Sequence, residues 1–113
     1  MDPVQVVQEF TDASNARDVD RVVDCFSADA VVQNDAGHVF AQVVEAIRAH
    51  FGGFLSQSPN FHSEILSRIH VGSWVVQEEH VTGLVVKEPV PEFNTISAYR
   101  VEDGKIVKCI GLQ

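Results

Sequence analysis

Residues 4–30 constrain the fold of this chain most, because they predict two short amphipathic helices joined by a tight polar corner. Before the first helix, Asp2 can cap the free amides, Pro3 suits the first helical position, and Gln5 sits where a capping box needs it. The apolar stripe of this helix comprises Val6, Val7, Phe10 and Ala13. After the corner, Asp18 is a candidate cap for the second helix. The apolar face of the second helix comprises Val19, Val22, Val23 and Phe26.

The rest of the chain predicts one more helix and mainly β structure. A strand begins at Val31, Gly37 marks a turn, and residues 38–40 form a short return. A third helix follows from about Val43, and Gly52-Gly53 weakens or ends it. Residues 61–71, 74–86, 95–101 and 106–112 predict four strands, the last two joined by an Asp-Gly hairpin turn. Helices followed by antiparallel strands indicate a single α+β domain over residues 1–113.

Composition narrows the class of partner. The formal net charge is −8, with 16 acidic and 8 basic residues, which disfavours nucleic acid and anionic membranes. No apolar run is long enough to span a bilayer, and we expect no signal peptide, because no charged segment followed by an apolar stretch opens the sequence. Two widely separated cysteines, Cys25 and Cys109, predict reduced thiols, and therefore a cytoplasmic protein.

The order of these elements resembles the ketosteroid isomerase-like superfamily, which includes nuclear transport factor 2-like and SnoaL-like (polyketide cyclase-like) domains. The resemblance covers nearly the whole chain and is carried by VVQEFTDASNARDVDRVVDCFSADAVVQNDAG, AIRAHF and YRVEDGKI. It implies three N-terminal helices packed on a strongly curved antiparallel or mixed sheet, forming a cone-shaped apolar pocket in a cystatin-like roll. It also implies a homodimer through the outer face of the sheet.

The residues that perform catalysis in the isomerase itself are altered here. Its helix-one tyrosine is matched by Phe10, its proton-shuttling aspartate by Asn34, and its oxyanion-binding aspartic acid by Ser97. Steroid isomerisation by that mechanism is therefore not expected.

Two other members of the superfamily are similar in part. The segment VVQN looks like the water-holding strand of limonene epoxide hydrolase, but the positions matching its aspartate-arginine-aspartate relay are Thr82, His80 and Ile110. Nuclear transport factor 2 is similar around GHVFAQVVEAI, yet Asp35 and Ala36 replace its tryptophan and glutamate for partner recognition.

Alternation along the strands suggests a different acid–base site. If Ser97 faces the concave side of the sheet, Tyr99 does so too, and the neighbouring strand would send Trp74, Glu78 and His80 inward. Asp35 would lie at the mouth. Buried carboxyl and imidazole groups have the chemistry for proton transfer, so Asp35, Glu78 and His80 are the candidate catalytic residues.

Alternatives to this interpretation remain. Glu78, Glu79 and His80 could form a solvated edge, and a register slip of one residue would turn Gln77, Glu79 and Val81 inward instead. The candidate substrate-binding residues are Phe10, Phe26, Asn34, His38, Phe51, Trp74, Ser97, Tyr99 and Ile110. His50, His62 and His70 do not cluster with carboxylates, so we expect neither a metal nor another cofactor.

Three functional hypotheses follow. The first is an acid–base isomerase, dehydratase, cyclase or hydrolase that acts on a small hydrophobic molecule. The second is a non-catalytic protein that binds an apolar ligand on the same fold, and the third is a dimerisation module. Two titratable groups inside the pocket would favour the enzyme, whereas a purely apolar cavity would favour the carrier.

Overall fold

The computed structural model describes residues 1–112, which form three helices and eight strands. The helices are α1 (Pro3–Asn15), α2 (Val19–Asp24) and α3 (Val44–Gln57). The predicted capping box is present at α1: the Gln5 amide donates to Asp2 Oδ1, and the Asp2 amide donates to Gln5 Oε1, both at 2.9 Å. Asp18 caps α2 as predicted. Within residues 1–112, no helix has the length and apolar character needed to cross a membrane.

Six strands form one curved, unclosed sheet in the order β2-β1-β8-β7-β4-β3. Their bounds are β1 (Phe26–Asn34), β2 (Val39–Gln42), β3 (His62–Val71), β4 (Trp74–Thr82), β7 (Phe93–Glu102) and β8 (Lys105–Gly111). The β1–β8 pair is parallel and the other neighbouring pairs are antiparallel, so the predicted mixed α+β fold is confirmed. A separate hairpin consists of β5 (Val85–Val86) and β6 (Glu88–Pro89).

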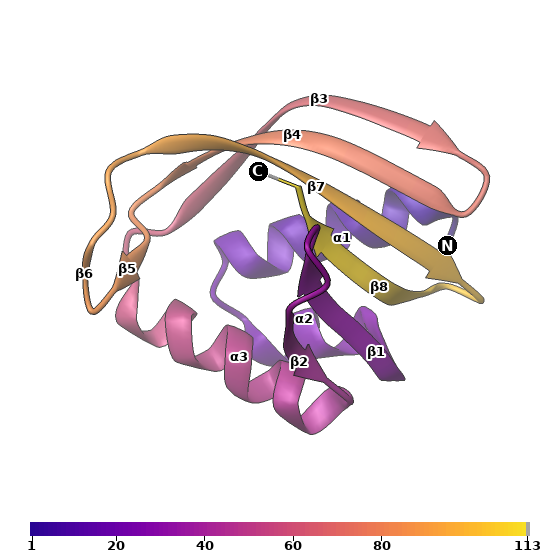
Figure 1. Ribbon diagram of the computed structural model, residues 1–113, viewed down its shortest axis with the longest axis horizontal. Coiled ribbons are helices and arrows are strands. Elements are labelled where there is room, and N and C mark those ends of the chain that lie inside the picture. Colours follow the sequence, from indigo (N-terminus) through magenta and orange to yellow (C-terminus); the bar gives the residue numbers. More distant parts are fainter. Residues whose placement is uncertain (113) are drawn as a thin grey trace.

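The helices lie on the concave side of the sheet, while β3, β4 and β7 arch over them (Figure 1). Irregular pairing in β3, between Ile65 and Ser67, and in β7, between Arg100 and Val101, accompanies this curvature. Side chains from both layers fill the core between them. Those fully enclosed there include Val6, Val22, Ile47, Val75 and Ile106.

Several element bounds differ from the sequence prediction. The strand predicted over residues 74–86 ends at Thr82, and Val85–Val86 belongs to the separate hairpin. Strand β1 begins at Phe26 instead of Val31, because Phe26 already pairs with Ile106 of β8 before the pairing becomes irregular. Helix α3 continues through Gly52-Gly53, since its buried residues, Ile47, Phe51 and Leu55, anchor it on both sides of the glycines. This packing outweighs a helix-propensity cost of about 1 kcal/mol per glycine.

The register of β4 differs by one residue from the register that the sequence prediction favoured. Val75 pairs with Tyr99, Gln77 with Ser97, and Glu79 with Thr95, so the odd-numbered residues of β4 share the concave face with Ser97 and Tyr99. The predicted inward orientation of Trp74, Glu78 and His80 is therefore wrong, because paired residues must share a face and side chains alternate with period two. These three residues lie on the outer face instead.

Candidate functional site

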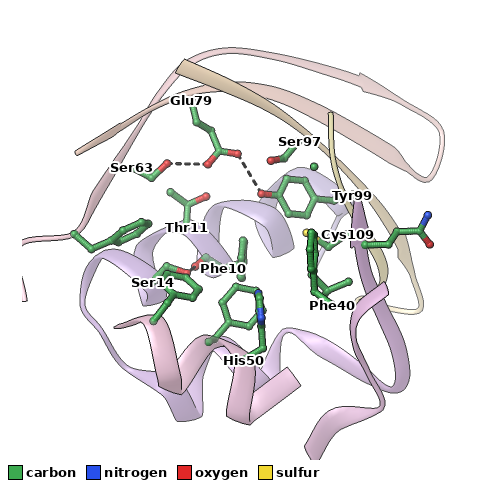
Figure 2. Close-up of a pocket in the computed structure, with 16 residues that line it drawn as sticks. Phe10, Thr11, Ser14, Phe40, His50, Ser63, Glu79, Ser97, Tyr99 and Cys109 are labelled. Atoms are coloured by element: carbon green, nitrogen blue, oxygen red, sulfur yellow. Dashed lines mark hydrogen bonds between the residues drawn. The ribbon is translucent and has the colours of Figure 1, made fainter. Parts of the chain in front are cut away.

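A cavity of about 280 Å³ lies between the concave face of the sheet and the helices (Figure 2). Its apolar wall and its polar end come from different elements. The lining residues are Phe10, Thr11, Ser14, Val32, Gln33, Phe40, His50, Phe51, Phe54, Phe61, Ser63, Glu79, Ser97, Tyr99, Cys109 and Gly111.

Aromatic rings form the apolar wall. Phe10 of α1 packs edge-on against Phe51 of α3, with their centroids 5.4 Å apart, and lies 5.5 Å from the ring of Tyr99. Phe54 continues the wall, at 5.5 Å from Phe51 and 5.6 Å from Phe61. Edge-to-face contacts of this kind hold aromatic rings in defined positions, so the wall is preformed for an apolar ligand.

Glu79 of β4 forms the polar end of the cavity. Its side chain is 8% exposed, and its Oε1 accepts a 2.8 Å hydrogen bond from the hydroxyl of Ser63. Its Oε2 accepts one hydrogen bond from the hydroxyl of Tyr99 at 3.2 Å and another from the side-chain Nε2 of Gln77 at 3.3 Å. Three neutral donors thus orient this buried carboxyl group, and Figure 2 shows two of them, Ser63 and Tyr99.

Gln77 is itself held in one orientation. The guanidinium of Arg68 donates to Gln77 Oε1 at 3.1 and 2.9 Å and also to Gln8 Oε1 at 2.9 Å. Since Gln77 Oε1 accepts from Arg68, its NH2 group faces Glu79 and also donates to the hydroxyl of Thr11 at 3.3 Å. The Thr11 oxygen accepts this bond, which leaves its own proton free to donate.

Burial keeps two neighbouring groups protonated. The pKa of Tyr99 lies well above its ordinary value, first because the phenol is buried and then because Glu79 is beside it. Burial also raises the pKa of Cys109 to about 12. At neutral pH the cavity therefore contains a phenol and a thiol as neutral groups.

His50 of α3 lines the side of the cavity opposite Glu79 (Figure 2). Its ring is parallel to Phe40 within 11°, at a centroid distance of 6.1 Å, and meets Phe51 and Phe54 edge-on. Burial lowers the pKa of this imidazole, which favours its neutral form.

Of the predicted substrate-binding residues, Phe10, Phe51, Ser97 and Tyr99 line the cavity. Phe26 lies behind the wall, in edge-to-face contact with Phe10 at 5.5 Å. These residues were predicted correctly because the sequence pattern already indicated which side of their helix or strand faces the pocket.

Asp35, Asn34 and His38 do not line the cavity. Asn34 ends β1, and Asp35 and His38 lie in the exposed turn that follows it. Asn34 Oδ1 accepts hydrogen bonds from the backbone amides of Ala36 at 3.0 Å and His38 at 2.9 Å. Asn34 therefore organises the turn, and its placement in the site was wrong because a turn-capping amide points back to its own backbone.

Glu78, His80, Trp74 and Ile110 lie on the outer face of the sheet, away from the cavity lining. Glu78 accepts a hydrogen bond from Ser67, and Ile110 pairs with Ala98.

His80 is engaged on this outer face. Its Nδ1 lies 2.6 Å from Asn94 Oδ1 and its Nε2 lies 3.5 Å from a carboxylate oxygen of Glu92. The Asn94 bond and then the Glu92 carboxylate raise its pKa, so the imidazole interacts with groups outside the cavity.

The one-residue register offset explains most of what the sequence prediction missed. Glu79 was considered only as the alternative register, and Cys109 occupies the cavity position assigned to its neighbour Ile110. Ser63 lies on the neighbouring strand β3 and faces the cavity because it pairs with Val81 of β4. Its signal in the sequence was a lone serine near the start of a strand, which is too weak to single out. Within residues 1–112, no three His, Cys, Asp or Glu side chains gather in a way that could hold a metal ion.

The sequence of residues 7–109 matches the SnoaL-like domain family. The chain belongs to the SnoaL-like family. The match covers all the elements that build the cavity except the start of α1 and the end of β8, which confirms the resemblance proposed from the sequence motifs. None of the curated proteins matches this SnoaL-like domain.

Solved structures show the same fold. A cystatin-fold protein from Novosphingobium aromaticivorans superposes with a TM-score of 0.93 at 28% identity, covering 100% of this chain and 99% of that one. A candidate polyketide cyclase from Sinorhizobium meliloti has a TM-score of 0.78 at 23% identity, with coverages of 95% and 93%. An LEH-like epoxide hydrolase from M. tuberculosis has a TM-score of 0.81 at 18% identity, with coverages of 97% and 80%. At these lower identities, the latter two show similarity of fold alone.

Proposed function

We propose that this SnoaL-like domain is an acid–base enzyme of the isomerase, dehydratase, cyclase or hydrolase type, acting on a small hydrophobic molecule in the cytoplasm. The observation that carries the proposal is Glu79, an 8% exposed carboxyl group that opens onto an aromatic cavity. Glu79 replaces Asp35, Glu78 and His80 as the catalytic candidate, because none of those three lines the cavity.

Glu79 would accept a proton from the bound substrate. Ser63, Gln77 and Tyr99 fix the orientation of its carboxyl group, so no reorganisation is needed when the substrate binds. Glu79 is only 8% exposed, and this burial strengthens its electrostatic interactions with a bound ligand.

Hydroxyl groups near Glu79 would stabilise the negative charge that develops on the substrate. Thr11 has a free proton, and Ser97 lies on the same concave face. Tyr99 stays protonated because burial and Glu79 raise its pKa, but its proton is already donated to Glu79 and serves to orient that carboxyl group. Fixed donors aimed at developing charge are a large contribution to catalysis in enclosed sites.

Exchange of acidic C–H protons with D2O tests the proposal without knowledge of the natural substrate. The probe is 2-tetralone, an uncharged ketone that carries one aromatic ring, followed by NMR. We expect the wild-type protein to accelerate exchange at the carbon between the ring and the carbonyl group. Glu79→Gln should lower that acceleration by about 100-fold or more, since loss of a general base typically costs 10²–10⁴ in rate.

Glu78→Gln is the matched control, because it removes the neighbouring carboxylate from the outer face of the same strand. It should leave the exchange rate unchanged. Equal rates for wild type and Glu79→Gln would overturn the role of Glu79. Ligand binding with no exchange above the buffer rate would favour the non-catalytic binding protein, for which a cavity with one anchoring group is sufficient.

We also infer a homodimer through the outer face of the sheet. Its centre is apolar, with Ile69, Val76, Ala98 and Ile110 in one row across four strands. Ile69 is 64% exposed. An apolar sheet face of this kind favours a partner.

The charge pattern beside the apolar centre supports a second copy as that partner. The row on one side of the apolar centre contains Arg100 and Lys108, and the two rows on the far side contain Glu78 and Glu64, the latter paired with His80. A two-fold rotation would place the basic row of one copy over the acidic rows of the other.

A further inference from the structure

We propose that the cavity binds a small, uncharged aromatic alcohol, such as a phenol of one or two rings, whose hydroxyl donates a hydrogen bond to Glu79. The inference deepens the proposed function, because it names the substrate class of the same cavity and rests on that cavity being the functional site.

The charge around Glu79 excludes an anionic ligand. Within residues 1–112, the cavity lining includes neither lysine nor arginine. The guanidinium of Arg68 donates its hydrogen bonds to Gln77 and Gln8, and not to the Glu79 carboxyl group. A carboxylate or phosphate ligand would therefore face the buried Glu79 carboxylate without a counter-charge, which is costly next to a side chain that is 8% exposed.

Hydrogen-bonding capacity favours a ligand with a single donor. An ionised carboxylate can accept about four hydrogen bonds. Oε2 of Glu79 already accepts from Tyr99 and Gln77, and Oε1 accepts from Ser63. About one acceptor position, on Oε1, is left for a ligand. One hydroxyl group satisfies that position, whereas an ammonium group brings three donors and a charge that must be desolvated.

The shape of the cavity favours a flat, compact ligand. Its walls include the phenyl rings of Phe10, Phe51, Phe54 and Phe61. Its volume of about 280 Å³ lies at the small end of ligand pockets, which typically range over roughly 300–1,000 Å³. A single aromatic ring or two fused rings match this space better than a larger ring system.

Binding of four naphthalene derivatives to the full-length protein, measured by calorimetry, tests the inference. They are 2-naphthol, 2-methylnaphthalene, 2-naphthoate and 2-naphthylmethylammonium, which share the ring system and differ in the attached group. We expect 2-naphthol to bind about 10- to 100-fold more tightly than 2-methylnaphthalene, as one hydrogen bond to a charged group predicts. Both charged derivatives should bind more weakly than 2-naphthol.

Two variants identify the group responsible. Glu79→Gln should reduce the preference for 2-naphthol over 2-methylnaphthalene and should strengthen binding of 2-naphthoate about 10-fold, because the repelling charge is gone. Glu78→Gln should change neither value, since that side chain lies on the outer face.

Equal binding of 2-methylnaphthalene and 2-naphthol by the wild-type protein would overturn the inference. Tighter binding of the ammonium or the carboxylate would overturn it as well, and would assign the site to that charge class. The binding test and the proton-exchange test can fail independently of each other. A Glu79-dependent preference for the alcohol can be present without catalysis, and catalysis on 2-tetralone can be present without that preference.

Discussion

The hydroxyl of Tyr99 lies 3.2 Å from Oε2 of Glu79 and donates a hydrogen bond to it across the concave face of the sheet. The two residues come from neighbouring strands, β7 and β4, and Tyr99 is 2% exposed. Since both partners are buried, removing the phenol oxygen would leave the carboxyl group with one donor fewer in a place that water hardly reaches.

Tyr99→Phe should therefore lower the free energy of unfolding by about 1–3 kcal/mol, as expected for a buried hydrogen bond to a charged group. Urea denaturation would measure the loss. A double-mutant cycle with Glu79→Gln isolates the pair, because the two losses should not add when the residues interact directly. Strictly additive losses would show that the hydrogen bond contributes nothing to stability.

The two histidines His50 and His80 should titrate on opposite sides of the ordinary histidine pKa of about 6.5. Burial lowers the pKa of His50, whereas the hydrogen bond to Asn94, and then the Glu92 carboxylate, raise that of His80. NMR titration of the ring protons would measure both midpoints. His50 titrating above His80 would contradict the structure.

These directions also predict how stability depends on pH. The folded-state pKa of His50 is below its unfolded value, so the unfolded chain binds more protons between the two values, and His50 makes the protein less stable as pH falls through that window. For His80 the sign is opposite: its contribution is present at low pH and is lost as pH rises through its raised folded-state pKa. In His50→Gln, the loss of stability on acidification should be smaller than in the wild type.

Gly83 should not tolerate a side chain. It has a φ of +73°, and a Cβ atom there would lie 2.0 Å from the carbonyl oxygen of Asn60. Gly83→Ala should therefore cost at least about 2 kcal/mol of unfolding free energy. Gly53→Ala is the control, since nothing lies within 4 Å of its added Cβ and alanine should stabilise α3 by about 0.5–1 kcal/mol. Thermal unfolding of both variants would reveal the opposite signs, and equal shifts would refute the prediction.

Both cysteines should be unreactive in the folded protein. Burial raises the pKa of Cys25 to about 11 and that of Cys109 to about 12, so little thiolate is present at pH 8. Ellman's reagent should label the native protein slowly and both thiols at once after unfolding in guanidinium chloride. Complete labelling of the native protein within minutes would contradict this burial.

The outer face of the sheet should determine the oligomeric state. A charge placed at its apolar centre, as in Ile69→Glu, should convert the inferred dimer into monomers in analytical ultracentrifugation. Val86→Glu, in the separate β5–β6 hairpin, alters an equally exposed apolar side chain outside that face and should leave the dimer intact. A monomeric wild-type protein at high concentration would disprove the interface.

Much of the fold was predictable because its signals are local. The Asp2 cap and the apolar stripe of α1 depend on residues three or four positions apart, and the Asp-Gly turn after Glu102 depends on adjacent ones. The order of helices and strands then indicated the family. The start of β1 was missed because Phe26 enters the sheet through pairing with Ile106, which is distant in the chain.

The sequence alone determined that, of Glu78 and Glu79, one would face the concave side of the sheet and the other the outer side. It did not determine which of the two faces the concave side. Each face of β4 contains two apolar residues, Val75 and Val81 on one face and Trp74 and Val76 on the other. Hydrophobic alternation therefore could not decide which face of the strand is turned inward. Only the pairing of Val75 with Tyr99 in the tertiary structure directs Glu79 inward and Glu78 outward. The physical reason is that strand register depends on the partner strand, and a shift of one residue moves every side chain to the other face.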